Sequence, residues 1–120
     1  MKITAEQHST ATRTVQVVKV DGYLDAHTFP DVEKVLRGLL DTGCYHIILD
    51  FETLDYISSA GLGLLLGIHR MVAQRLGALK IVNMSESVAS IFDVLGFSRI
   101  IDVLPDRASA LRAFDKTDSN

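Results

Sequence analysis

The strongest constraint on the fold is a short, almost wholly apolar run at residues 45–51, YHIILDF. A strand with one solvent-facing side alternates apolar and polar residues, whereas a strand buried on both faces reads as a continuous apolar run. Residues 45–51 therefore predict a central strand of a sheet that is covered by helices.

Strand-like and helix-like segments alternate through the rest of the chain. Further strands are predicted from β-branched or alternating apolar residues at about residues 3–7, 14–20, 79–84 and 100–104. Helices are predicted to start near residues 28, 59, 85 and 105, where apolar residues recur at helical spacing. The alternation implies βαβ units. We expect one α/β domain over residues 1–115, a mixed sheet of about four to five strands with about four helices, and a polar tail at 116–120.

Several predicted helix ends carry recognisable residues. Thr28 and Asp31 resemble a capping box, and Gly43 can close the same helix. Ser85 is a good N-cap for the third helix, and Gly96 is a good stop for it.

Composition narrows the classes of function. The net charge is −3, and the basic residues are scattered singly, which argues against a nucleic-acid partner. A single cysteine, Cys44, excludes an internal disulfide and fits a reducing compartment. The N-terminus lacks the apolar stretch of a signal peptide, and no apolar run reaches the ~18 residues of a membrane span. We expect a cytoplasmic protein that binds another protein or a small ligand, not a membrane.

Residues 55–63, DYISSAGLG, join the central region to a predicted helix and contain two adjacent serines, Ser58 and Ser59. A serine at this place is explained by N-capping, but capping accounts for only one of them. Sites in open α/β sheets form where strands end and helices begin, and a helix N-terminus favours an anion. A phosphoryl group on Ser59 adds a charge of about −1.5 to −2, which the helix tolerates and a docked protein surface does not. The segment predicts a binding switch.

Three glycines in the same helix, Gly61, Gly63 and Gly67, require a reason, because each costs about 1 kcal/mol relative to alanine. Close approach of another part of the chain or of a partner is the expected reason. We expect tight internal packing at Gly67 and partner access at Gly61.

Other chemistries find no support in the sequence. The glycines are spaced wrongly for dinucleotide binding, and a Walker lysine is missing. The four histidines show no metal-ligand spacing. Ser59 has no identifiable general base, so we expect neither a catalytic residue nor a cofactor, and therefore no enzyme.

Three stretches resemble the STAS family, and specifically its stand-alone anti-sigma factor antagonists. Residues 22–28, GYLDAHT, are similar to the family's G-x-L-D-x-x-T segment. Residues 49–51 followed by 56–63 resemble its core signature, and residues 91–97, IFDVLGF, resemble its third-helix segment. The likeness covers nearly the whole chain, and the order and spacing of the three stretches imply the STAS fold.

The resemblance implies a function by partner switching. Antagonists of this family bind an anti-sigma factor that is also an ATP-binding serine kinase, and binding frees the sigma factor. The kinase phosphorylates the serine at the start of the second helix, which is Ser59 here, and a serine phosphatase restores binding. Ser58 stands where many phosphorylated members have aspartate, and it is a possible second acceptor. The partner-binding residues implied by position are Asp25, Ser58, Ser59, Ala60, Gly61 and Leu62.

Two other functions remain open at this stage. One is a constitutive STAS interaction module or scaffold that is never phosphorylated, which the serine at position 58 favours. The other is a sensor that binds a nucleotide or lipid near the same helix start.

Overall fold

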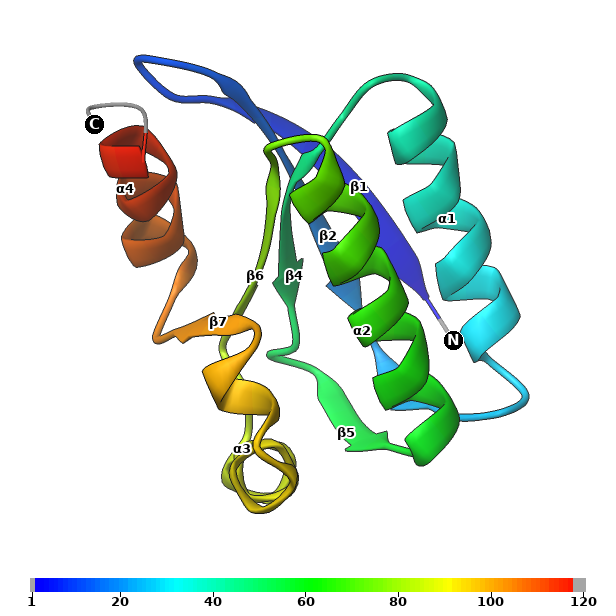
Figure 1. Ribbon diagram of the computed structural model, residues 1–120. Helices are drawn as coiled ribbons and strands as arrows, with labels where there is room; N and C mark the ends of the chain where they lie inside the picture. Colours follow the sequence, from blue (N-terminus) through cyan, green and yellow to red (C-terminus); the bar gives the residue numbers. More distant parts are fainter. Residues whose placement is uncertain (1, 118–120) are drawn as a thin grey trace.

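The computed structural model describes residues 2–117, with side chains described up to residue 115 (Figure 1). The strands are β1 (Ile3–Ser9), β2 (Thr14–Val20), β3 (Gly22–Leu24), β4 (His46–Asp50), β5 (Leu54–Ile57), β6 (Ala78–Val82) and β7 (Asp102–Leu104). The helices are α1 (Phe29–Asp41), α2 (Ser59–Gln74), α3 (Glu86–Leu95) and α4 (Arg107–Thr117), with a short 3₁₀ helix, η1 (Phe97–Arg99), after α3.

The main sheet has five strands in the order β1-β2-β4-β6-β7. β1 is antiparallel to β2, and the remaining neighbours are parallel. Right-handed crossovers through helices are the usual way to join parallel strands, and α1, α2 and α3 lie between the strands in the chain. The predicted mixed sheet with four helices is therefore confirmed.

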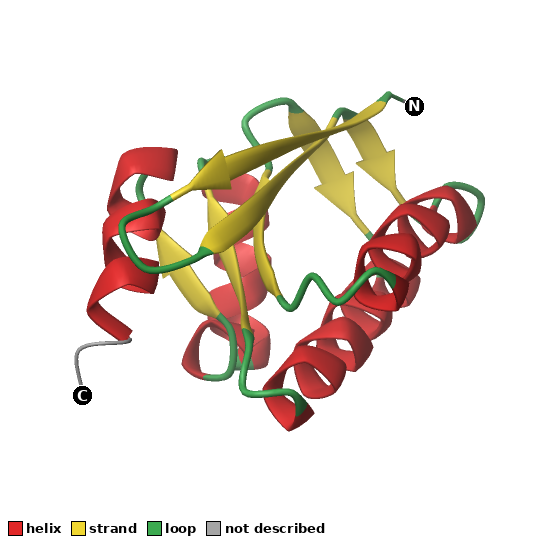
Figure 2. Cartoon of the chain, turned by 90° about the horizontal axis from the view of Figure 1, so that it is seen from above, coloured by secondary structure: helices red, strands yellow, loops and turns green. Residues whose placement is uncertain are grey.

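Both faces of the sheet are covered, and β4 lies between the two layers (Figures 1 and 2). Ile47 and Leu49 of β4 pack in the core on the side of α1 and α2. Ile48, between them in the chain, packs on the opposite side with Ala110 and Phe114 of α4. Since successive side chains of a strand point to opposite faces, this arrangement confirms the prediction of a doubly buried central strand.

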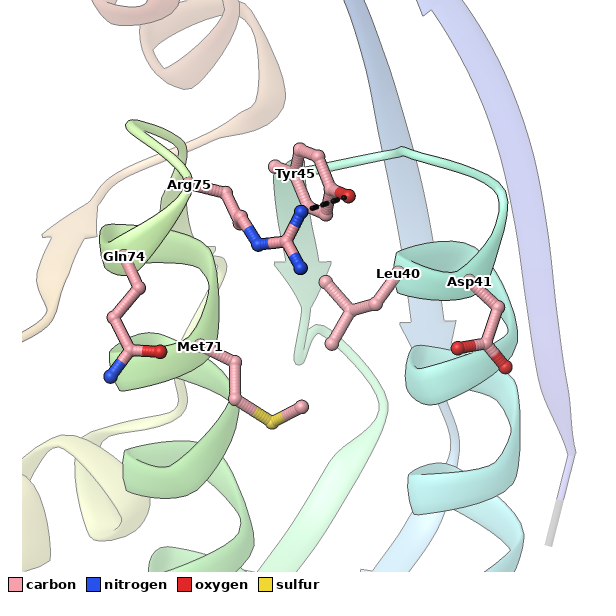
Figure 3. A pocket seen from close by; sticks show the side chains of 6 residues that line it. All are labelled: Leu40, Asp41, Tyr45, Met71, Gln74 and Arg75. Atoms are coloured by element: carbon pink, nitrogen blue, oxygen red, sulfur yellow. Dashed lines mark hydrogen bonds between the residues drawn. The ribbon is translucent and has the colours of Figure 1, made fainter.

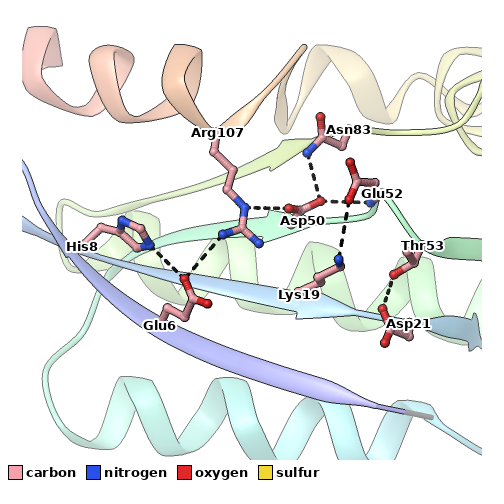
Figure 4. Close-up of polar contacts among 9 residues, drawn as sticks. All are labelled: Glu6, His8, Lys19, Asp21, Asp50, Glu52, Thr53, Asn83 and Arg107. Carbon is pink, nitrogen blue, oxygen red and sulfur yellow. Dashed lines mark hydrogen bonds and ion pairs between the residues drawn. The ribbon is translucent and has the colours of Figure 1, made fainter.

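α4 is attached to the sheet by buried charge as well as by apolar packing (Figure 4). Asp50, at the end of β4, accepts hydrogen bonds from Arg107 Nε (2.7 Å), Asn83 Nδ2 (3.1 Å) and the Glu52 N–H (3.0 Å). Burial raises the pKa of Asp50, but these donors outweigh it and hold the pKa below its usual value. Arg107 Nη1 also lies 3.5 Å from Glu6 Oε2 of β1. The first turn of α4 is therefore linked both to β4 and to the edge strand β1.

Some predicted boundaries differ from the structure. The predicted strand at 100–104 begins only at Asp102, because residues 97–99 form η1. The last helix begins at Arg107, two residues after Pro105, and Asp106 caps it by accepting the Ser109 N–H at 2.8 Å. α4 then continues to Thr117, so residues 116–117 belong to the helix and not to the expected tail. Residues 118–120 lie outside the described part of the chain.

The ends of α3 match their predicted caps. Ser85 accepts the Val88 N–H at 3.3 Å, and Gly96 ends the helix with φ +78. Gly43 likewise follows α1 with φ +86. Among residues 2–117, none of the helices combines the length and the apolar character that a bilayer crossing requires.

Candidate functional site

A second, two-stranded sheet, which the sequence did not predict, positions the serine segment. β3 and β5 run parallel, with Leu24 paired with Ile57. The Ser58 N–H donates to the Leu24 carbonyl at 2.8 Å. Because the strands are parallel and end together, Asp25 and Ser58 follow them at the same edge, with Asp25 in the turn that precedes α1 and Ser58 directly before α2. The structure thus brings together the two halves of the predicted site.

The two serines have different roles at the start of α2. Ser58 is extended (φ −94, ψ 174), and its Oγ accepts the Gly61 N–H at 3.3 Å, which makes it the N-cap. Ser59 is the first helical residue and is exposed. Among the described residues, its hydroxyl has no hydrogen-bond partner. In the first turn, the N–H groups of Ser59 and Ala60 have no carbonyl four residues earlier within the helix. The Ser59 hydroxyl, which the sequence predicted as the phosphoryl acceptor, therefore makes no hydrogen bond among the described residues, whereas the Ser58 hydroxyl caps α2.

The expected roles of the glycines are reversed in the structure. A Cβ on Gly61 would lie 2.8 Å from Leu24 Cγ and 2.9 Å from both Ile57 Cγ1 and the Leu24 carbonyl oxygen. Gly61 is thus required for internal packing, and the prediction of partner access at this residue was wrong. Gly67 is exposed, and a Cβ there would meet nothing within 4 Å, so its expected tight packing was also wrong.

The other predicted contact residues differ in exposure. Leu62 is buried at 5% exposure, and its side chain belongs to the core beneath the site. Ala60 is half-buried. Within the predicted set, Ser59 is exposed, Asp25, Ser58 and Ala60 are half-buried, and Gly61 and Leu62 are buried.

Asp25 is fixed by the turn that precedes α1. Its Oδ1 accepts the N–H of His27 (2.9 Å) and of Thr28 (3.2 Å), and the Thr28 hydroxyl accepts the Asp25 N–H in return (2.9 Å). The bond from His27, with those from Thr28, holds the pKa of Asp25 below its usual value. The predicted capping box of Thr28 with Asp31 was wrong, because Thr28 makes no side-chain cap for α1 and pairs with Asp25 instead.

Two tyrosines beside the serines were missed in the sequence reasoning. Tyr23 of β3 and Tyr56 of β5 are direct partners in the register, and their exposed fractions are 57% and 48%. Their rings meet edge to face with centroids 6.5 Å apart. Along a strand, alternate residues share a face, so Tyr23 is on the side of Asp25 and Tyr56 on the side of Ser58. The sequence contained a sign of both tyrosines, since Tyr23 lies two residues before Asp25 and Tyr56 two residues before Ser58, and both of these were predicted site residues.

The described residues also contain a cleft at the opposite end of α2 (Figure 3). It has a volume of about 180 Å³ and lies between the last turns of α1 and α2. Arg75 donates to the Tyr45 hydroxyl there at 3.3 Å. Ligand pockets usually measure about 300–1,000 Å³. Because this smaller cleft is at the far end of α2 from Ser59, it gives no support to a sensor site at the helix start. No three His, Cys, Asp or Glu side chains in residues 2–117 are grouped as metal ligands.

Comparison with known proteins agrees with this fold. Residues 2–110 match the STAS domain family. The anti-sigma F factor antagonist of Paenibacillus polymyxa is 28% identical over 112 residues, which cover 92% of each chain. The anti-sigma-B factor antagonist of Staphylococcus aureus (strain NCTC 8325) is 33% identical over 86 residues, which cover 72% of this chain and 80% of the relative.

Solved structures show the same fold. The unphosphorylated form of the anti-sigma factor antagonist SpoIIAA has a TM-score of 0.69 and 22% identity, covering 98% of this chain and all (100%) of its own. The phosphorylated form of SpoIIAA, a Bacillus cell fate determinant, has a TM-score of 0.67 and 23% identity, covering 92% of this chain and 99% of its own. The fold and the site therefore define the class of protein, which is a small α/β domain with a serine at the start of a helix. The chain belongs to the STAS domain family.

Proposed function

We propose that this chain is an anti-sigma factor antagonist switched by phosphorylation of Ser59. In this function it acts in the cytoplasm by binding and not by catalysis. Its unphosphorylated form binds an anti-sigma factor that is also a serine kinase, and the bound sigma factor is released. A serine phosphatase returns the phosphorylated form to the binding state. The observation that carries the proposal is the free, exposed hydroxyl of Ser59 beside a serine that already caps the helix.

The chemistry of the switch requires only an accessible hydroxyl on this chain. The Ser59 Oγ attacks the γ-phosphorus of ATP held by the kinase, the bond from that phosphorus to the β,γ-bridging oxygen breaks, and ADP leaves. The hydroxyl proton passes to a base of the kinase or to solvent. In-line transfer needs free space around Oγ, and the exposure of Ser59 supports this geometry.

The fold can accept the phosphate because of where Ser59 lies. The unpaired N–H groups of the first turn and the positive end of the helix dipole favour an anion. The core does not lie next to the hydroxyl, so the added group stays in water. A partner packed on this surface would instead bury a new dianion, and buried unpaired charge is costly. Phosphorylation therefore weakens binding without unfolding the protein.

The exposure of Ser59 and the capping role of Ser58 support Ser59 over Ser58 as the phosphoryl acceptor. The Ser58 side chain is half-buried, and phosphorylating it would remove the cap from the Gly61 N–H. Serine and aspartate are comparable N-caps, so a serine at position 58 has the capping function that an aspartate would have there. What it removes is a negative charge next to the acceptor.

The test combines capture with site mapping. Ser59→Ala and Ser59→Asp proteins are used as bait in lysates of the native cells, and retained proteins are identified. We expect Ser59→Ala to retain an anti-sigma factor that Ser59→Asp retains poorly. The purified factor with Mg-ATP should then modify wild-type protein on Ser59, and Ser58→Ala protein equally well. Equal capture by the two bait proteins would contradict the switch.

The constitutive STAS module remains the second candidate, since Ser58 replaces the charged neighbour of the acceptor. The same mapping separates it from the switch. A factor that is captured by wild-type and both Ser59 variants, and that never modifies residues 57–62, would assign the chain to this second class.

A further inference from the structure

Tyr23 and Tyr56 are two exposed aromatic residues on the strands that lead to Asp25 and Ser58. The pairing of β3 with β5 shifts by one residue between Gly22 and Tyr23, so Asp55 is the extra residue on β5. Bulges of this kind re-aim the side chains that follow them. Here the shift places Tyr56 opposite Tyr23, and the two rings meet edge to face with their centroids 6.5 Å apart. The two rings therefore form one exposed aromatic pair on the strands that lead into Asp25 and Ser58.

This end of the molecule is acidic. Residues 21–33 and 51–63 contain six Asp or Glu and no Lys or Arg, while the rest of the chain contains nine acidic and twelve basic residues. Two of the six have ion-pair partners: Glu33 pairs with Arg37 and Glu52 with Lys19. Among the side chains that the structure describes, up to residue 115, no ion pair involves the other four, which are Asp21, Asp25, Asp31 and Asp55.

We propose that Tyr23 and Tyr56 form the central contact for the anti-sigma factor, and that this partner presents a basic, arginine-bearing surface to them. The inference rests on the proposed function and adds the chemistry of its partner. Tyrosine is enriched among the residues that dominate interface energies. A guanidinium stacks on a tyrosine face and also pairs with carboxylates, so arginine suits both the rings and the unpaired aspartates.

The charge distribution selects this occupant over a second copy of the chain. In a symmetric dimer through the tyrosine pair, the unpaired aspartates of both copies would face one another, and like charges oppose such contact. A basic partner gains attraction from the same groups. Because Tyr56 lies only three residues before Ser59 in the chain, the proposed partner seated on the tyrosines also covers the Ser59 hydroxyl, where the phosphate would be buried.

Calorimetric titration of the purified anti-sigma factor tests the inference. We expect Tyr23→Ala and Tyr56→Ala to weaken binding by roughly tenfold or more. Leu76→Ala is the control, because Leu76 is 92% exposed but follows α2 at its other end; its affinity should stay within about twofold. Added salt should weaken wild-type binding, and Asp55→Asn should reduce that salt dependence. Thermal unfolding of each variant checks that the exposed substitutions leave the fold intact.

The outcomes separate this inference from the proposed function. If Ser59→Asp abolishes binding while both tyrosine variants bind like wild type, the switch stands and the tyrosine surface is refuted. If Ser59→Asp binds like wild type, the switch itself fails. A concentration-dependent dimer that the tyrosine variants lose would assign the surface to self-association and overturn the inference. If no anti-sigma factor is retained by any bait, both proposals fail.

Discussion

Replacing Gly61 by alanine puts a methyl group where the chain at Leu24 already lies. The new Cβ would be 2.8 Å from Leu24 Cγ and 2.9 Å from the Leu24 carbonyl oxygen. A side-chain atom can rotate away, but the carbonyl belongs to β3 and accepts the Ser58 N–H, so the start of α2 must shift. Overpacking of this kind costs about 1–3 kcal/mol.

Gly67→Ala is the matched control, because the same substitution in the same helix meets nothing within 4 Å. Alanine gains about 1 kcal/mol over glycine in a helix interior. Gly67 lies in the interior of α2 and Gly61 in its first turn, so the gain is largest at Gly67, and the contact with Leu24 adds to the difference between the two variants. We expect Gly61→Ala to be less stable than Gly67→Ala by about 1–3 kcal/mol, and Gly67→Ala to be more stable than wild type.

Urea unfolding followed by far-ultraviolet circular dichroism measures this difference, because the chain has no tryptophan to report by fluorescence. The midpoints should separate while the dependence on urea stays the same. If Gly61→Ala is as stable as Gly67→Ala, the close approach of α2 to β3 does not exist as described, and the placement of Ser59 beside Asp25 loses its support.

Four further substitutions test other parts of the structure. Ser58→Ala should lower the free energy of unfolding by about 1 kcal/mol through loss of the N-cap, whereas Ser59→Ala should change it by no more than about 0.5 kcal/mol; equal effects in urea titrations would contradict the division of roles. Asp50→Asn should cost about 2–3 kcal/mol, less than the 3–5 of a fully buried pair, because Arg107 is 32% exposed. The pKa of Asp50 is lowered in the folded protein, so the ionised carboxylate contributes its full stabilisation above the unfolded pKa of about 3.9, and this stabilisation is lost as the pH falls through the lower folded value. The Asp50→Asn protein should therefore lose less stability than wild type when the pH is lowered through this range. Identical pH profiles of the free energy of unfolding would refute this prediction. Phe114→Ala should cost about 3–5 kcal/mol, because the ring is fully buried between α4 and the sheet, and a loss below about 1 kcal/mol would show that α4 is not held as described.

Local patterns in the sequence predicted most of the main sheet and its helices. β4 was identified from its apolar run, and α3 from Ser85 and Gly96, because burial on both faces and capping leave marks within a few residues. The position of Ser59 at the start of α2 was predicted for the same reason.

The errors came from contacts between residues that are distant in the chain. β3 and β5 contain three and four residues, too few for a periodic pattern, and they are stabilised by pairing with each other. The packing role of Gly61 depends on Leu24, which no spacing rule connects to it. Asp50 and Arg107 are 57 positions apart. The charged Asp50 within the apolar run at 45–51 was a local sign that a buried partner was needed.

In the proposed switch, one phosphate on Ser59 ends partner binding while the fold persists. The most direct measurement compares the affinity of the purified anti-sigma factor for unmodified protein and for protein phosphorylated only on Ser59. We predict a loss of about 100-fold or more, since burying an unpaired charge in an interface costs several kcal/mol, with circular dichroism spectra that coincide. Equal affinities for the two forms would contradict the proposed phosphorylation switch.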